Sequence, residues 1–398
     1  MTQRLYFEDS YLREFDANVL ECRKTDEGYA VRLDRTAFYP TSGGQPHDMG
    51  TLGAANVTDV AMDSDGELWH TIDCALEVSS GVHGRIDWAR RFDHMQQHAG
   101  EHLLANALYR LMGGHTIGLH LGAEVSTIDV NLPDGKTHIS GDEIRALEDD
   151  VNARIQEGAP IRSWFPVDEE LGTIPLRKQP AVDEDIRVVQ IGELEFCACG
   201  GTHPSSAGQI GLFKITDARP SRGKLRIAFV CGGRAFALLR EHYEIATAAA
   251  EILSTSVGNL PNLVGSMVEQ LKASEKACAL MRKEQLIARI PEMLARAQIS
   301  KSGIRVVAEQ VEADAISARE LATRIAQSEN TIAILAADSG GGYAHIACRA
   351  ADVGANMGEM LSGAAKVCGG KGGGRAEFAQ GGGPIEMFER MRGEAIQL

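Results

Sequence analysis

The feature that most constrains this chain is a pair of histidines, His98 and His102, in a proline-free stretch at residues 92–112. Apolar residues in this stretch recur at helical spacing and predict a helix with one buried stripe. They are Leu103, Leu104, Ala107, Leu108 and Leu111. Side chains four residues apart on a helix project from one face, so both imidazoles can reach one zinc ion at about 2.0–2.1 Å. An isolated HxxxH is a weak signal, because such pairs also arise by chance on solvated faces.

A second candidate half-site lies in a distant segment, Cys199-Gly-Gly-Thr-His203. Thiolate and imidazole ligands suit zinc, and the two glycines permit the backbone to turn tightly around an ion. Together the two segments predict a Zn²⁺ site with the ligands His98, His102, Cys199 and His203. His94 with His98 is a rival pair that spacing alone leaves open, whereas Cys197 breaks the four-residue spacing and is left out.

The role of such a metal follows less directly from the residues. Four ligands would complete a tetrahedral shell, as in a structural zinc site. The chain has no CxxC pair, however, and the ligands come from two distant segments of a chain with enough apolar residues to form its cores. We therefore interpret the site as functional. A catalytic zinc usually keeps a position for water or substrate, so either one ligand is displaced or the ion accepts a fifth.

Composition places the chain among ordinary globular proteins. Its 398 residues, 44% of them hydrophobic and 24% charged, predict two or three domains with full cores. No long apolar run or signal core is evident, so we expect a soluble, cytoplasmic protein with no membrane association. The eight scattered cysteines are expected to be reduced thiols. A net charge of −15 argues against binding polyanions over the whole surface but permits a local basic patch.

Hydrophobic patterning predicts an α+β chain in four parts. Residues 1–90 read as a small β-barrel-like domain, with strands expected at 18–22, 29–33, 67–72 and 82–86. Residues 91–232 read as an α+β domain that contains the metal ligands. Residues 233–300 read as a helical spacer, which would serve as a connector or a dimerisation arm. Residues 301–398 read as an α/β domain, in which parallel strands at 304–307 and 331–336 flank a helix at 315–327.

Two further regions are candidates for phosphate contacts. A predicted hairpin carries five cations opposed only by Asp217 in the same segment, although a solvated hairpin explains them equally well. These are Lys214, Arg219, Arg222, Lys224 and Arg226. A Gly-rich loop at residues 368–375 carries Lys371 and Arg375, and could offer backbone N–H groups and two cations to a phosphate. It is not a P-loop, because no Ser or Thr follows the lysine.

These motifs together resemble a known family. HAGEHLL followed by CGGTH, preceded by FYPTSGGQPHDMG and followed by GQIGLFKI, is similar to the editing domain of alanyl-tRNA synthetases. CGGKGGGRAEFAQGGG resembles the DHH-associated domain that ends the same synthetases, and no segment resembles their aminoacylation core. The combination is similar to the long form of the free-standing alanyl-tRNA editing proteins, AlaX, over nearly the whole chain. The family pattern selects His98 and His102 rather than His94 and His98.

The resemblance implies an activity and its partners. It implies deacylation in trans of tRNA(Ala) mischarged with serine, with glycine as a second substrate, at a zinc site in residues 91–232. It implies that the C-terminal domain contacts tRNA and that the chain is a homodimer. A buried polar group matching the seryl hydroxyl would disfavour alanine, which leaves it unpaired. The residues expected to contact substrate are Thr41, Ser42, Gln45 and His120, although a satisfied core histidine is an equal reading of His120.

Three alternatives are weighed against this function. One is a non-catalytic RNA-binding protein with a structural zinc. Another is a deacylase of a different mischarged tRNA, such as one carrying threonine, because threonyl-type editing domains share the half-site pattern. A phosphoesterase is disfavoured, because the chain has no Asp-His-His triplet of the kind that accompanies the DHH-associated domain in those enzymes.

Overall fold

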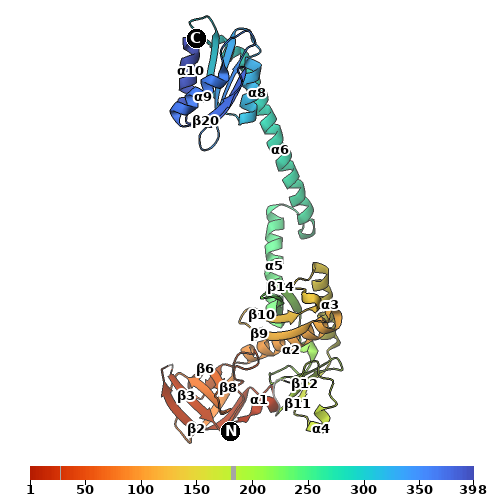
Figure 1. Cartoon of the computed structure of the whole chain (residues 1–398). Helices are drawn as coiled ribbons and strands as arrows, with labels where there is room; N and C mark the ends of the chain where they lie inside the picture. The colour runs from red at the N-terminus through yellow and green to blue at the C-terminus, as the bar shows by residue number, and fades with distance from the viewer. Residues whose placement is uncertain (27, 181–184) are drawn as a thin grey trace. The chain divides into compact units, whose positions relative to one another are not determined.

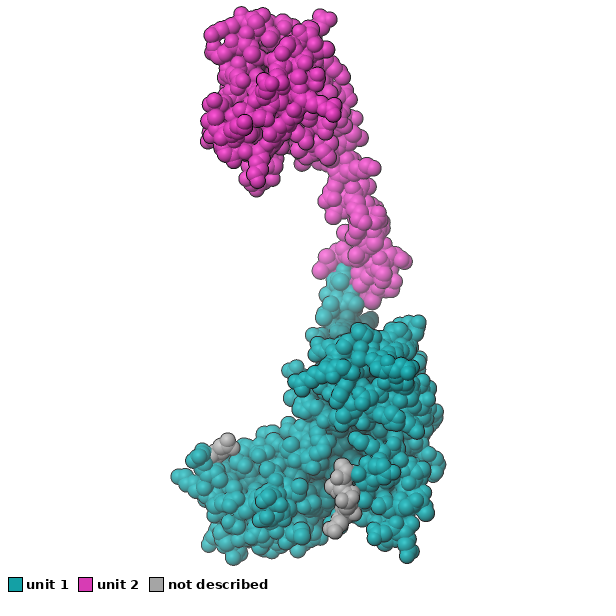
Figure 2. Space-filling model, viewed as in Figure 1, with its two compact units in different colours: residues 1–249 teal, residues 250–398 magenta. Residues whose placement is uncertain are grey.

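The computed structural model describes residues 1–26, 28–180 and 185–398. The chain divides into two compact units, Met1–Ala249 and Ala250–Leu398 (Figure 2). Each unit has hydrophobic cores of its own. None of the helices in the described ranges combines the length and apolar character needed to cross a membrane.

The first unit begins with a closed barrel in the strand order β2-β3-β7-β6-β5-β8, in which all neighbours are antiparallel (Figure 1). Along β2, Phe15, Ala17 and Val19 are buried and alternate with exposed polar residues, the period-two pattern of a half-buried strand. The structure confirms the predicted small barrel. Its strands are β2 (Glu14–Thr25), β3 (Gly28–Leu33), β5 (Gly50–Leu52), β6 (Ala55–Met62), β7 (Leu68–Ile72) and β8 (Gly81–Ile86).

A buried ion pair joins the barrel to the helix that follows it. Arg91 and Asp48 are both fully buried, and Arg91 Nε donates to both Asp48 carboxylate oxygens at 2.9 Å. Arg91 Nη1 also donates to the carbonyl of Ser10 at 3.0 Å. Because a buried charge is tolerated only when it is paired and hydrogen-bonded, this network fixes the helix against the barrel. Short elements nearby are β1 (Gln3–Arg4), α1 (Leu5–Glu8) and β4 (Arg35–Thr36).

Helix α2 (Trp88–Met112) carries the two histidines. It begins at Trp88 rather than at residue 92, because the Asp87 side chain caps it by accepting from Arg90 N–H. It ends at Met112 as predicted, where Gly113 adopts φ 64°. Helix α3 (Gly141–Glu157) begins with a capping box between Ser140 and Glu143.

Two sheets complete the first unit. The strand order is β14-β15-β10-β9 in one and β11-β12-β13 in the other. Apolar residues of α2, α3 and the four-stranded sheet form one core. The strands are β9 (His115–Leu121), β10 (Ser126–Asn131), β11 (Ile161–Trp164), β12 (Val188–Ile191), β13 (Glu195–Ala198), β14 (Phe213–Ser221) and β15 (Lys224–Cys231). The short helical turns are η1 (Pro133–Gly135), α4 (Asp168–Leu171) and η2 (Ala207–Ile210).

The segment predicted as a spacer is largely helical. It contains α5 (Gly232–Ile252), η3 (Val257–Asn259), α6 (Leu260–Ala288) and α7 (Ile290–Ala295). Pro261 lies in the first turn of α6. Backbone N–H groups there have no intrahelical acceptor, so the N–H that proline lacks is not missed.

The second unit contains a six-stranded sheet in the order β16-β17-β18-β19-β21-β20. Strands β17 and β18 are parallel and are connected by α8, as predicted, but the other neighbouring pairs are antiparallel. The predicted α/β arrangement therefore describes one connection and not the whole domain. The elements are β16 (Gln298–Ile299), β17 (Arg305–Val311), α8 (Ala315–Ile325), β18 (Thr331–Asp338), β19 (Tyr343–Arg349), α9 (Met357–Cys368), β20 (Lys371–Gly374), β21 (Phe378–Gly383) and α10 (Glu386–Gln397).

The predicted Gly-rich loop near Lys371 is instead a β-hairpin of β20 and β21 at the sheet edge. Its glycines permit close packing. A Cβ at Gly372 would lie 2.5 Å from Gly381 Cα and 2.6 Å from Leu361 Cδ2 of α9. The sequence expectation was wrong here because glycine serves both for ligand approach and for tight packing of backbone on backbone.

Candidate metal centre and substrate pocket

The four predicted ligands come together in the first unit. His98 and His102 project from α2, and Cys199 and His203 lie in the segment that follows β13. The ligand atoms of all four lie within 4.8 Å of one another. Cys199 Sγ is 3.4 Å from both His98 Nε2 and His203 Nε2.

The donor set and its surroundings fit a metal ion. Both ring nitrogens of His102 and Nδ1 of His203 are buried and have no hydrogen-bond partner in the described part of the chain. Buried polar atoms without partners are costly, and an ion at the centre of the cluster would satisfy His102 Nε2. Three imidazoles and one thiolate form a ligand set that zinc accepts.

The surroundings of His203 and Cys199 favour the protonation states in which these side chains coordinate a metal. Burial lowers the pKa of His203 to about 3, so its imidazole is neutral. Burial alone would raise the pKa of the Cys199 thiol, but the surrounding imidazoles, which lie within hydrogen-bond distance of Sγ, outweigh burial and hold this pKa well below its ordinary value. A neutral imidazole and a thiolate are the forms that coordinate metals.

Gln45 orients His98 from behind. Its Oε1 accepts from His98 Nδ1 at 2.8 Å, and its Nε2 donates to Thr202 Oγ1 at 2.8 Å. Because an amide oxygen only accepts, His98 carries its proton on Nδ1 and presents Nε2 to the cluster. Gln45 is fully buried. Its position therefore favours a role in orienting the metal ligand His98 over the direct substrate contact expected from the sequence.

Glu195 occupies the corresponding position behind His102. Its Oε1 lies 3.7 Å from His102 Nδ1, and it accepts hydrogen bonds from Arg177 Nε at 2.8 Å and from Asn106 Nδ2 at 2.9 Å. Burial would raise its pKa, but His102 and Arg177 outweigh it and lower the pKa. The sequence interpretation missed Glu195. The available signal was an acidic residue at a strand position just before the CACGGTH motif.

One of the two glycines between Cys199 and His203 has a steric role. A Cβ on Gly201 would lie 2.2 Å from His98 Cε1 and 2.9 Å from Gln45 Oε1, whereas a Cβ on Gly200 would meet nothing within 4 Å. The CGGTH segment can approach the helix closely only because residue 201 has no side chain.

The cluster opens into a cavity of about 250 Å³, here called the metal-side cavity. The barrel, α2, β9 and the Cys199 segment all contribute to its walls. Its lining includes Tyr39, Ser42, His98, Glu101, His102, Arg177, Cys199 and Gly200. Three of the four ligands face this space, which places the cluster at the wall of a cavity rather than inside a closed core.

Glu101 is the one acidic side chain among the described residues that line the metal-side cavity. It is 6% exposed, and its carboxylate makes no hydrogen bond or ion pair to any described residue. Burial opposes the charge on nearby Arg177, but Glu195 and Glu101 outweigh it and raise the Arg177 pKa. The guanidinium itself is hydrogen-bonded to Glu195, which leaves Glu101 available to a ligand. The sequence interpretation missed this residue, although it lies between the two histidines.

Comparisons with known proteins show the family of this chain. The alanyl-tRNA editing protein AlaX-L of Pyrococcus horikoshii is 30% identical to the chain, over 98% of this chain and 97% of that protein. This chain belongs to the AlaX-L family. The match therefore extends over both units.

Larger synthetases share the same region. The alanine–tRNA ligase of Pyrococcus furiosus is 34% identical over 100% of this chain but only 43% of its own length. That of Methanothrix thermoacetophila is 33% identical over 96% of this chain and 42% of its own length. The chain thus spans less than half of these ligases.

Two family models match this chain. The threonyl and alanyl tRNA synthetase second additional domain matches residues 186–228, which include Cys199 and His203. The DHHA1 domain matches residues 303–398.

The remaining predicted substrate contacts take different positions. Ser42 lines the metal-side cavity, but Thr41 and His120 do not. Thr41 Oγ1 lies 3.1 Å from His47 Nδ1 and accepts from His47 N–H. His120 is exposed on β9, so the alternative reading of a buried core histidine is wrong.

Two cations of the predicted basic hairpin are neutralised by acids from other elements. Lys214 Nζ lies 2.8 Å from Glu148 Oε1, and Arg226 Nε lies 2.7 Å from Asp129 Oδ1. Asp217 is the one acid within the segment itself, and the fold adds these two partners from distant segments. Arg219 pairs with Asp217 at 3.2 Å.

Four predicted phosphate contacts have side chains that make no ion pair within the described residues. Arg222 lies in the turn between β14 and β15, and Lys224 is the first residue of β15. Lys371 and Arg375 are exposed at the β20–β21 hairpin of the second unit. These four remain predicted tRNA contacts.

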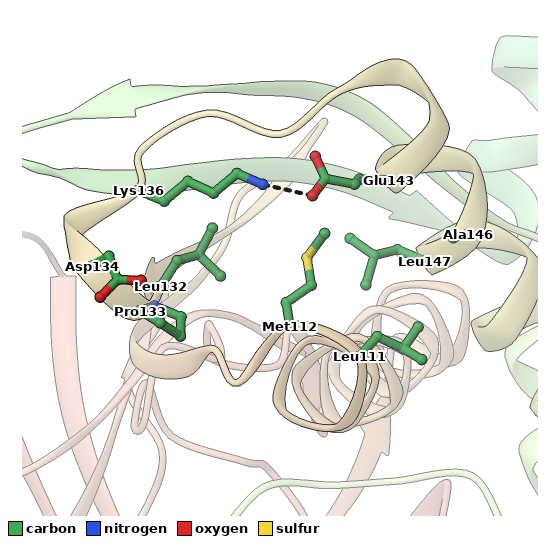
Figure 3. Close-up of a pocket in the computed structure, with 9 residues that line it drawn as sticks. All are labelled: Leu111, Met112, Leu132, Pro133, Asp134, Lys136, Glu143, Ala146 and Leu147. Carbon is green, nitrogen blue, oxygen red and sulfur yellow. Dashed lines mark hydrogen bonds and ion pairs between the residues drawn. The ribbon is translucent and has the colours of Figure 1, made fainter.

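A further cavity of about 450 Å³ lies at the end of α2, away from the metal ligands (Figure 3). Leu111, Met112, Leu132 and Leu147 form its apolar walls, and Lys136 Nζ lies 2.6 Å from Glu143 Oε1 across it. Lys136 and Glu143 neutralise one another, which leaves Asp134 as the one charged lining residue that makes no ion pair within the described residues.

Proposed function

We propose that this chain hydrolyses the ester bond of tRNA(Ala) mischarged with serine, acting in trans, with glycine as a second substrate. The observation that carries the proposal is the His98, His102, Cys199 and His203 cluster at the wall of a small cavity, in a chain of the AlaX-L family. A structural metal site would need no such opening.

We propose Zn²⁺ as the ion that these four residues hold. Bound there, zinc would supply Lewis acidity toward the ester carbonyl or lower the pKa of a bound water to about 7. Gln45 and Glu195 would orient His98 and His102 so that Nε2 of each ring faces the ion.

Glu101 is the proposed partner of the substrate's α-ammonium group. An aminoacyl ester carries one positive charge on this group, and Glu101 is a buried carboxylate without a hydrogen-bond partner among the described residues that line the cavity. A charge-assisted hydrogen bond to it would fix the aminoacyl group beside the metal ligands.

Ser42 is the proposed partner of the seryl hydroxyl. Its own hydroxyl makes no hydrogen bond to a described residue and lines the cavity, whereas the hydroxyl of Thr41 is engaged by His47. A bound substrate would cover Ser42, and an alanyl group would leave it unpaired, which disfavours alanine.

The other proposed contacts lie outside this cavity. Arg222, Lys224, Lys371 and Arg375 would hold tRNA phosphates. Homodimerisation would use apolar side chains that α6 exposes, namely Val264, Met267, Val268 and Leu271. Sedimentation measurements would detect the dimer.

The decisive experiment measures clearance of Ser-tRNA(Ala), Gly-tRNA(Ala) and Ala-tRNA(Ala) by protein of known metal content. We expect fast loss of serine, retention of alanine, and loss of activity and metal together in Cys199→Ala. Cys74→Ala, which alters an exposed thiol outside the site, is the matched control and should behave as wild type. Absence of clearance by metal-loaded wild type on all three substrates would refute the proposal and favour a non-catalytic RNA-binding role.

A further inference from the structure

A second cavity, of about 760 Å³, reaches the same metal-ligand segment from another side. It shares six lining residues with the metal-side cavity, here called the shared rim: Tyr39, Ser42, Gly43, Ala198, Cys199 and Gly200. Its remaining walls include Tyr6, Phe7 and Phe165 together with Arg4 and Arg187, so we call it the aromatic cavity.

Of the three aromatic walls of this cavity, Phe165 is exposed and Phe7 is half-buried, whereas Tyr6 is buried. Phe7 and Phe165 meet edge to face with ring centroids 5.5 Å apart, and Tyr6 lies 4.7 Å from Phe7. Phe165 is 48% exposed, so it contributes little to core packing. Exposed aromatic rings next to a guanidinium form the kind of surface on which unpaired nucleobases stack.

Arg187 connects the aromatic cavity to the metal ligands. Its guanidinium carbon lies 5.3 Å from the Phe7 ring centroid. Its Nη1 donates to the carbonyls of Cys199 at 3.1 Å and Gly201 at 2.8 Å, and its Nη2 donates to Ser163 Oγ at 2.6 Å. The aromatic wall and the ligand segment are therefore held in one fixed arrangement.

If the proposed function holds, the covalent structure of the substrate indicates which part of it each cavity would bind. The ester joins the amino acid directly to the terminal ribose, so the base on that ribose must lie immediately beside the aminoacyl group. The metal-side cavity contains Glu101 and three metal ligands and is the smaller, which suits the aminoacyl group. The aromatic cavity lies across the shared rim and is large enough for a nucleoside.

We propose that the aromatic cavity binds the 3′-terminal adenosine of the tRNA, with the adenine base stacked on Phe165. This inference rests on the proposed function and adds a second subsite to it. The ribose would lie at the shared rim, beside Ser42 and Cys199.

The test uses full-length protein and two ligands that cannot be hydrolysed. One is 3′-deoxy-3′-(L-serylamino)adenosine, and the other is the same serylamide on a ribose without a base. We expect wild type to bind the adenosine ligand more tightly. Phe165→Ala should weaken that ligand roughly 5- to 20-fold, the lower part of the range for loss of one stacking contact, and leave the baseless ligand unchanged.

Two further variants serve as controls. Phe165→Tyr keeps an aromatic ring and should retain most of the affinity. Phe236→Ala removes an aromatic ring of similar exposure on α5, 62% against 48%, and should have no effect. Equal binding of the two ligands by wild type, or an equal loss of both in Phe165→Ala, would overturn the inference.

Deacylation of Ser-tRNA(Ala) by the same samples separates this inference from the proposed function. Clearance by wild type with no preference for the adenosine ligand refutes the adenosine subsite and leaves the function standing. No clearance by metal-loaded wild type refutes both, because the nucleoside would no longer belong to a substrate.

Discussion

At the scale of single residues, the site combines a predicted ligand set with partners that only the structure reveals. His98 and His102 are oriented by Gln45 and Glu195, which lie far from them in the sequence. Glu101 lies between these histidines on α2 and also lines the metal-side cavity. Its carboxylate has no hydrogen-bond partner in the described chain. The chemistry of the site therefore depends on side chains with unequal roles, some holding the ligands and one available to substrate.

Glu101→Gln tests the proposed ammonium contact. Loss of a charge-assisted hydrogen bond of about 1.5–3 kcal/mol predicts roughly a 10- to 150-fold lower kcat/KM on Ser-tRNA(Ala). Metal content should be unchanged, because Glu101 is not among the clustered ligands. The substrate with an acetylated amino group should be poor for wild type and equally poor for the variant. A variant that still discriminated between the two substrates as strongly as wild type would rule out this contact.

Gly201→Ala tests the steric requirement of the CGGTH segment. Its methyl group would meet His98 Cε1 at 2.2 Å, so the ligand must move, and we expect a lower metal stoichiometry and loss of clearance. Gly200→Ala is the matched control, because a Cβ there meets nothing within 4 Å. Metal analysis after gel filtration measures the difference. Equal metal content in the two variants would contradict the steric argument.

At the scale of elements, the barrel is part of the site and not a separate attachment. The segment between β4 and β5 supplies Gln45 behind His98 and Ser42 in the cavity wall. The same segment supplies Asp48, whose buried pairing with Arg91 holds α2 in place. The barrel thus positions the helix that carries two of the ligands.

Gln45→Leu tests this support. Removing the acceptor for His98 Nδ1 should lower metal affinity about 10- to 100-fold, the usual effect of losing a hydrogen bond to a ligating histidine. Competition with a chromophoric chelator measures the affinity. Ser42→Ala alters the same turn without touching His98 and should keep wild-type affinity. Similar metal affinity in all three proteins would show that His98 does not need Gln45.

At the scale of the whole molecule, the chain joins a unit with the metal cluster to a second unit that matches the DHHA1 domain. Because the net charge of −15 disfavours binding of RNA over the whole surface, we expect RNA to contact local groups of exposed cations. In the second unit, Lys371 and Arg375 lie on the β20–β21 hairpin. Their proposed role is binding, separate from the chemistry in the first unit.

Lys371→Glu combined with Arg375→Glu tests this division of roles. We expect a higher KM for Ser-tRNA(Ala) with little change in kcat, and a weaker salt dependence of binding, by about one unit of slope for each lost phosphate contact. Binding of the serylamide adenosine ligand should be unaffected. A fall in kcat with unchanged KM would contradict a role in tRNA binding.

Local patterns in the sequence were sufficient to predict several elements of the fold and the candidate metal ligands. Helical spacing predicted α2 and its two histidines, alternation predicted four barrel strands, and the ligand types in CGGTH predicted the second half-site. These features depend on residues close together in the chain, so periodicity and ligand chemistry reveal them. The family resemblance rests on the same motifs and agrees with the AlaX-L match.

Tertiary contacts decided the rest, because they join residues that no local pattern relates. Only the folded chain brings Gln45 to His98, brings Glu195 to His102, and pairs Lys214 and Arg226 with distant acids. The glycines near Lys371 form a packed hairpin because a neighbouring helix and strand leave no room for a Cβ. The sequence by itself determined which residues can hold a metal, whereas the tertiary structure determined which side chains orient them and which remain free for substrate, since burial and pairing are properties of the packed chain.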